Sequence, residues 1–284
     1  MSPYHLVDVN GDDGAGQKLF RQYKGSAFPS FIFLTSEGEE YDRAVGYFPR
    51  GSFISILKAN QGQQNSLLRL KKEIDSLKGV KKAKKTYTYI QKVFDVGKWE
   101  EGLELISKHL PETLFQEWGF DLRLMRGMIY SKMKNYSKAE IYLKVAWDQA
   151  SNEDEYMQAV RWLGRVYKKR GKKLERLELY EAAVQRYHSY QAYNGYAWYA
   201  SQDNIKLDRA LTYALKAADL SGNKAGILDT LAEVYYARGE FREALKTSRE
   251  IILKDQESKT YQKRHKKYWR ALKKSIQAPK SGES

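Results

Sequence analysis

Four basic side chains near the middle of the chain have the spacing of one helix face. Arg161 and Arg165 lie four residues apart, and Lys168 and Lys169 follow three and four residues later. Residues at such intervals project from the same side of an α-helix, where their charges could converge on a carboxylate or an acidic peptide. The alternative is an ordinary helix face that water solvates, and the sequence leaves both interpretations open. We call these four residues the basic face.

The sequence lacks the residues that most catalytic and metal sites need. It contains no cysteine, which excludes disulfides, thiolate metal sites and thiol catalysis by this chain. No glycine-rich phosphate loop or nucleophile elbow occurs. The four histidines lie far apart without the spacing of a metal motif: His5, His109, His188 and His265. We therefore expect no metal, no cofactor and no enzymatic activity from the chain as it stands.

The chain carries an excess of positive charge. Its formal net charge is +15, and residues 65–85 and 261–284 are strongly basic. Such a charge suits an acidic protein, an anionic membrane surface or a nucleic acid. A nucleic-acid partner is disfavoured for two reasons. No aromatic residues alternate with the lysines and arginines of residues 65–85, and the sequence contains no recognised nucleic-acid-binding motif. We expect a protein or peptide partner, with an acidic one favoured, and keep peripheral contact with anionic membranes as an alternative.

The apolar residues do not form a membrane-spanning pattern. No apolar run approaches the ~20 residues that a transmembrane helix needs. The first residues also lack the basic and apolar regions of a signal peptide. The sequence as written therefore predicts a cytoplasmic protein, whereas an export signal upstream of Met1 would place it in the periplasm or cell envelope.

Residues 1–60 combine strand and helix patterns. Strands are expected at 4–10, after Pro29 and at 41–47, and helices at 17–23 and 50–60. The stretch Ser26-Ala27-Phe28-Pro29-Ser30-Phe31-Ile32-Phe33-Leu34 resembles the cis-proline strand of a thioredoxin fold. The stretch Glu37-Gly38-Glu39-Glu40…Arg43…Gly46-Tyr47 that follows resembles the hairpin of the secreted bacterial members of that family.

The resemblance covers only the C-terminal half of a thioredoxin-like domain, because the half with Cys-x-x-Cys is missing from the sequence. It implies that Phe28 and Pro29 stand where the family pairs with the backbone of a peptide or thiol partner. Without a cysteine, we favour a purely structural role for the two residues at the entry to a strand. The competing interpretation of function is a truncated thiol–disulfide oxidoreductase or chaperone whose Cys-x-x-Cys lies upstream of Met1. Finding an in-frame Cys-x-x-Cys and an export signal upstream of Met1 would establish this second interpretation.

Self-similarity with a period of about 34 residues follows the first segment. Leu163-Gly164…Tyr167…Gly171 aligns with Leu231-Ala232…Tyr235…Gly239. Small residues at these positions let antiparallel helices approach closely, while large residues fill the space between them. The pattern resembles tetratricopeptide (TPR) repeats, and five repeats are expected at 83–112, 120–153, 157–189, 190–224 and 225–258.

The expected fold class is therefore α+β, with a partial thioredoxin-like α/β segment at 1–60 and an all-α TPR array at 83–258. A basic helical linker at 61–82 is expected to dock on the first repeat through one apolar face, which consists of Leu67, Leu70, Ile74 and Leu77.

A capping helix is expected at 259–276, because the last repeat needs a polar outer cover. Its apolar face would hold Tyr268 against the repeats, and its basic residues, Arg264 and Lys267 among them, would face solvent. Residues 277–284 are expected to form a disordered tail.

The resemblance to TPR proteins also implies where a partner would bind, because their partner peptides lie along the first helices of the repeats. We therefore expect a non-catalytic protein-interaction scaffold whose inner groove, within residues 120–258, contains the basic face. The pattern differs from the carboxylate clamp of chaperone-binding TPR proteins. Met128 and Trp198 would offer apolar contact. The inner positions expected beside the basic face are Leu124, Met128, Asn194, Trp198, Asp229 and Glu233.

Overall fold

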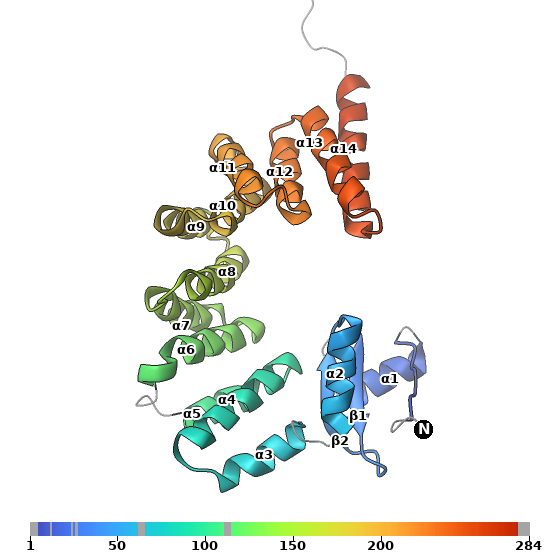
Figure 1. Ribbon diagram of the computed structural model, residues 1–284, viewed down its shortest axis with the longest axis vertical. Coiled ribbons are helices and arrows are strands. Elements are labelled where there is room, and N and C mark those ends of the chain that lie inside the picture. The colour runs from blue at the N-terminus through green and yellow to red at the C-terminus, as the bar shows by residue number, and fades with distance from the viewer. Residues whose placement is uncertain are drawn as a thin grey trace, which may run out of the picture. The chain divides into compact units, whose positions relative to one another are not determined.

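The structure, a computed structural model, describes residues 5–11, 13–23, 25, 28–61, 66–110 and 115–277. These residues form fourteen helices and two strands, and both strands belong to the N-terminal segment (Figure 1). The chain divides into two compact units, residues 1–139 and residues 140–284. The division falls within helix α7 (Tyr136–Asp148).

The first unit begins with a helix, a two-stranded hairpin and a second helix. These are α1 (Gly14–Gln22), β1 (Ser30–Leu34), β2 (Glu40–Val45) and α2 (Arg50–Gln61). The strands are antiparallel, with a register shift between Phe33 and Leu34. The ring of Phe31 on β1 lies 4.5 Å from that of Phe53 on α2, so aromatic packing joins the hairpin to the helix. The peptide bond between Phe28 and Pro29, just before β1, is cis.

The strand expected at residues 4–10 is wrong for the residues that the structure describes. Residues 5–10 adopt no regular secondary structure. Leu6 and Val7, the apolar residues that suggested the strand, are 89% and 78% exposed. A strand needs a neighbour for its backbone hydrogen bonds, and the sheet of the described residues contains only β1 and β2.

The rest of the first unit consists of helices. They are α3 (Leu67–Ser76), α4 (Gly79–Asp95), α5 (Trp99–His109) and α6 (Phe115–Lys132). Ser66 caps α3 by accepting a hydrogen bond from the backbone of Arg69. Leu70 and Ile74 of α3 pack against Tyr89 and Val93 of α4, as the amphipathic pattern predicts. The linker helix thus docks on the first helix pair.

The second unit continues the helical series from the latter part of α7. Its further helices are α8 (Glu153–Lys169), α9 (Lys173–Tyr187), α10 (Tyr190–Asp203), α11 (Leu207–Leu220), α12 (Ala225–Ala237), α13 (Phe241–Lys254) and α14 (Lys259–Gln277). From α8 to α14 each helix contacts the next, and α10 also contacts α12 (Figure 1). The helices therefore form an array of antiparallel pairs. Of the tail expected at 277–284, only Gln277 is described, as the last residue of α14.

The first helix of every pair ends in the same way. In each, the residue after the turn donates a backbone hydrogen bond to the carbonyl five positions earlier, for example from Lys172 to Tyr167 and from Glu240 to Tyr235. This bond needs a residue with positive φ in the turn, which glycine adopts at least cost. The turn residues with positive φ are Gly97, Lys134, Gly171, Asn204 and Gly239. The recurring turn explains the repeat period that the sequence shows.

The side chain of Tyr180 lies at the contact of three helices in the second unit. Its buried ring extends from α9 toward two glycines on different helices. A Cβ added to Gly164 on α8 would lie 3.2 Å from the ring, and one added to Gly195 on α10 would lie 2.2 Å from it. Glycine at 195 therefore provides the space that the ring fills, and α8, α9 and α10 pack around one side chain.

Replacing Gly195 by alanine tests this packing. We expect Gly195→Ala to lower the free energy of unfolding by about 1–3 kcal/mol, because the added methyl group overlaps the buried ring of Tyr180. The measurement is chemical denaturation followed by circular dichroism. Gly226→Ala is the matched control, because only the hydroxyl of Tyr261 lies near the added atom, at 4.0 Å. That change should be neutral or stabilising by up to about 1 kcal/mol. Equal behaviour of the two variants would contradict the packing role of Gly195.

Candidate functional site

Helix α8 is built so that the basic face points outward. Asn152 caps its first turn, accepting a hydrogen bond from the backbone of Glu155 at 3.0 Å. Acidic residues in the first turn and lysines in the last turn suit the helix dipole. The opposite side of the helix is buried, including Val160, Leu163 and Tyr167. The four residues of the basic face are exposed as a consequence.

No carboxylate among the described residues forms an ion pair with the basic face. Two acidic residues of the neighbouring helices, Glu140 and Asp203, pair with other bases. Glu140 contacts Lys172 at 2.9 Å and also pairs with Arg170. Asp203 pairs with the buried Arg176. The guanidinium of Arg165 lies 4.7 Å from the ring centre of Trp162, which is an aromatic partner and leaves its charge unneutralised. The basic face thus keeps its charge available for a ligand.

The basic face lies beside a tyrosine pair, in which Tyr180 on α9 is buried and Tyr199 on α10 is half-buried. The centres of their two rings lie 5.1 Å apart. Burial raises the pKa of Tyr180 well above 10, with smaller opposing effects from the nearby charges of Arg161 and Arg165. Tyr180 therefore remains neutral, and the two arginines stand close to it.

Helix α10 contributes the predicted groove residues Asn194 and Trp198. It begins at Ser189, whose hydroxyl accepts a hydrogen bond from the backbone of Ala192. Both predicted residues are half-buried. The side-chain oxygen of Asn194 is shielded from solvent and has no hydrogen-bond partner. This oxygen is an unused acceptor on the helix that packs against α9.

The predicted groove residues on α12 are bound by the chain's own last helix. Asp229 forms an ion pair with Arg264 of α14. Glu233, which is buried, accepts hydrogen bonds from Lys267 at 2.7 Å and from the hydroxyl of Tyr268 at 2.9 Å. Burial and the charge of Glu233 raise the pKa of Tyr268, so this hydroxyl remains a donor. The two carboxylates are engaged within the molecule.

The sequence missed the role of two α14 residues. It placed Arg264 and Lys267 among the solvated bases, whereas both face the acidic residues of α12. The guanidinium of Arg264 also lies 5.1 Å from the ring centre of Trp198. The apolar pattern of α14 correctly predicted that Tyr268 faces the repeats. It does not predict which basic side chains of the helix also face them. A signal was present in the four-residue spacing of Asp229 and Glu233.

The remaining predicted site residues belong to the first unit. Leu124 on α6 is buried in the structure, so it offers no surface to a ligand, in contrast to its expected groove position. Met128 on the same helix is half-buried. Phe28 is 60% exposed, and its ring stacks on that of Phe20 with centroids 4.3 Å apart. The basic face, Asn194 and Trp198 thus belong to the second unit, whereas Leu124, Met128 and Phe28 belong to the first.

The described residues contain neither a metal-type cluster nor a membrane-spanning helix. Nowhere among them do three or more His, Cys, Asp or Glu side chains gather as metal ligands. None of their helices is long and apolar enough to cross a membrane.

Solved structures resemble the array. A tetratricopeptide repeat protein from Parabacteroides merdae matches with a TM-score of 0.54 and 12% identity, over 67% of this chain and 75% of that one. The C-terminal part of a TPR repeat-containing protein from Cytophaga hutchinsonii matches with a TM-score of 0.50 and 15% identity, over 68% and 74%. The helical array has the TPR fold. No family model and no curated protein matches the sequence.

These likenesses confirm the TPR part of the sequence prediction. They show the fold of the array, and they give no support to the thioredoxin-like resemblance of residues 1–60, which stays a prediction. Within the TPR array, the basic face lies on α8, the first helix of its pair.

Glu140 supplies a test of how the acidic residues near α8 are engaged. Burial opposes its ionisation, but the hydrogen bond and charge of Lys172, with Lys144 and Arg170, outweigh it and hold the pKa of Glu140 below its ordinary value. The ionised form therefore adds stability above the unfolded-state pKa, and this stability is lost as the pH falls through the folded-state pKa.

We expect Glu140→Gln to lower the free energy of unfolding by about 1–3 kcal/mol near pH 7. The difference from the native chain should shrink as the pH falls below the ordinary glutamate pKa of about 4.3 and on through the lowered pKa of the folded state. Denaturation series at several pH values measure it. The exposed Glu178→Gln on α9 is the control and should show no such pH dependence. A Glu140→Gln deficit that is constant with pH would contradict the ion-pair account.

Proposed function

We propose that the chain is a non-catalytic interaction scaffold that binds an acidic peptide along α8 and α10 of its TPR array. The observation that carries the proposal is the basic face, with four exposed bases on one helix side and no ion-pair partner among the described residues. An uncompensated cluster of this kind attracts a ligand that supplies the missing negative charge.

The basic face would act by charge-assisted hydrogen bonding. The planar guanidinium groups of Arg161 and Arg165 match carboxylates in bidentate geometry, and the two lysines add point charges at the end of the helix. Because packing around Tyr180 holds α8 and α10 on α9, binding needs little rearrangement.

Helix α14 supports the same choice of ligand. Asp229 and Glu233 would repel an acidic peptide if their charges were uncompensated. Arg264 and Lys267 neutralise them from within the chain. The basic face on α8 therefore remains positively charged, while ion pairs neutralise the carboxylates of Asp229 and Glu233 on α12.

A charge reversal on α8 tests the proposal. The probe is a fluorescein-labelled hexaglutamate peptide, and its affinity is measured by fluorescence anisotropy at physiological salt. We expect Arg161→Glu with Arg165→Glu to weaken binding about a hundredfold, since two charge-assisted contacts are lost and replaced by repulsion. The helical circular dichroism signal should remain that of the native chain, because both side chains are exposed.

Helix α13 offers a control with matched charge and spacing. Arg242 and Lys246 are exposed, lie four residues apart, and form no ion pair with a described residue. Their reversal, Arg242→Glu with Lys246→Glu, changes the net charge equally and should alter affinity less than about threefold. Equal weakening by both double variants would show diffuse charge attraction and overturn the assignment to α8.

We infer in addition that residues 1–60 are related to the C-terminal half of a thioredoxin-like domain. The element order α1, β1, β2 and α2, with Pro29 at the entry to β1, supports the relation. Thiol exchange by this segment is excluded because the chain has no cysteine. The segment would thus serve as a structural module of the scaffold.

A further inference from the structure

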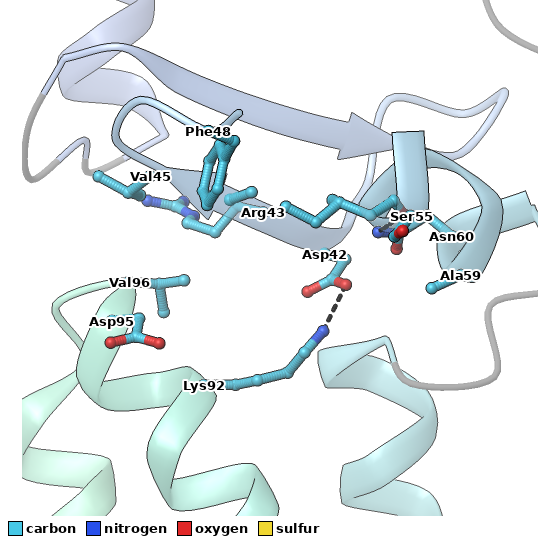
Figure 2. Close-up of a pocket in the computed structure, with 12 residues that line it drawn as sticks. Asp42, Arg43, Val45, Phe48, Ser55, Ala59, Asn60, Lys92, Asp95 and Val96 are labelled. Carbon is cyan, nitrogen blue, oxygen red and sulfur yellow. Dashed lines mark hydrogen bonds and ion pairs between the residues drawn. The ribbon is translucent and has the colours of Figure 1, made fainter. Parts of the chain in front are cut away.

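The first unit contains a cavity of about 580 Å³ that no part of the proposed peptide site uses. It lies where β2 and α2 face α4 (Figure 2). Its walls include the apolar side chains of Val45, Phe48, Ile56 and Val96. Its volume falls within the range of small-molecule sites, about 300–1,000 Å³.

Two buried acceptor oxygens at this cavity have no hydrogen-bond partner. Asp42 is 2% exposed and Asn60 is 5% exposed, and both line the cavity. The Oδ2 atom of Asp42 binds Lys92 at 2.6 Å, but its Oδ1 atom is unpartnered. The amide nitrogen of Asn60 donates to the carbonyl of Ile56, and its Oδ1 atom is likewise unpartnered. Buried acceptors in this state are rare, because each costs about 1–3 kcal/mol.

The charged groups at the cavity leave a preference for a cation. The guanidinium of Arg43 is engaged by both carboxylate oxygens of Glu40 at 2.5 Å. Lys92 is engaged by Asp42, and the carboxylate of Asp95 stands exposed at the rim (Figure 2). The atoms that remain unpaired are thus acceptors, and the charge without a partner at the rim is negative.

We propose that this cavity binds a small organic cation, a guanidinium group on a short apolar stem. A guanidinium presents several N–H donors in one plane, so it can serve Asp42 and Asn60 together, and its positive charge suits Asp95. The stem would lie against the apolar wall. A metal ion fits less well, because the described residues provide no cluster of three ligands here.

The test compares two ligands of equal shape on the full chain by isothermal titration calorimetry. The probe is n-butylguanidinium, and its neutral counterpart is n-butylurea. We expect the cation to bind with at least about tenfold higher affinity than the urea, because the charge-assisted hydrogen bonds need the positive group. Equal affinities, or no binding of the cation, would overturn the proposal. A capped arginine peptide serves as a third ligand, and its tighter binding would assign the site to a protein side chain and overturn a small-molecule ligand.

Variants locate the binding. Asp42→Asn should weaken the cation about tenfold. Because it also disturbs the pair with Lys92, Ala59→Phe provides a second variant, which adds a bulky apolar side chain at the cavity wall on α2 and leaves the polar side chains unsubstituted. It should abolish binding while the helical signal persists. Glu104→Gln, an exposed acidic residue of α5 outside the cavity, is the charge-matched control and should leave affinity unchanged. Retained binding in Ala59→Phe would place the ligand elsewhere.

Discussion

Close packing of three helices around Tyr180 is the constraint on which the candidate peptide site depends. The ring occupies the space that Gly164 and Gly195 leave free on α8 and α10. Because the buried side of α8 is fixed by this contact, the opposite side must carry residues that tolerate water. That side holds the basic face. The same contact therefore determines both the spacing of the helices and the direction in which the charges point.

The distribution of ion pairs explains why the positive charge of the basic face remains available. Several partly buried carboxylates are engaged with bases of neighbouring helices, as Glu140 is with Lys172 and Glu233 is with Lys267. Such partly buried pairs add specificity to the packing more than they add net stability. The basic face lies outside this network among the described residues. The basic face is therefore complementary to an acidic ligand without any change in the fold.

Much of the array could be predicted from the sequence, because its signals are local. The recurrence of Gly164, Ala232 and the turn glycines Gly171 and Gly239 reflects close helix approach and a turn with positive φ. The strand expected at 4–10 failed because strand formation depends on a neighbour that lies elsewhere in the chain. The local pattern of α14 did not predict that Arg264 faces α12, although the spacing of Asp229 and Glu233 carried a signal for it. The cavity around Asp42 could not be predicted, since it results from contacts between distant segments.

Zero-length carbodiimide cross-linking tests the central claim most directly, because it joins a carboxylate to an amine only when they are in contact. An acidic peptide bound to the full chain should cross-link to Lys168 and Lys169, with mass spectrometry identifying the sites. Exposed lysines on other helices, such as Lys246 and Lys273, should react far less. Cross-links distributed over all exposed lysines, with no preference for the end of α8, would contradict the account.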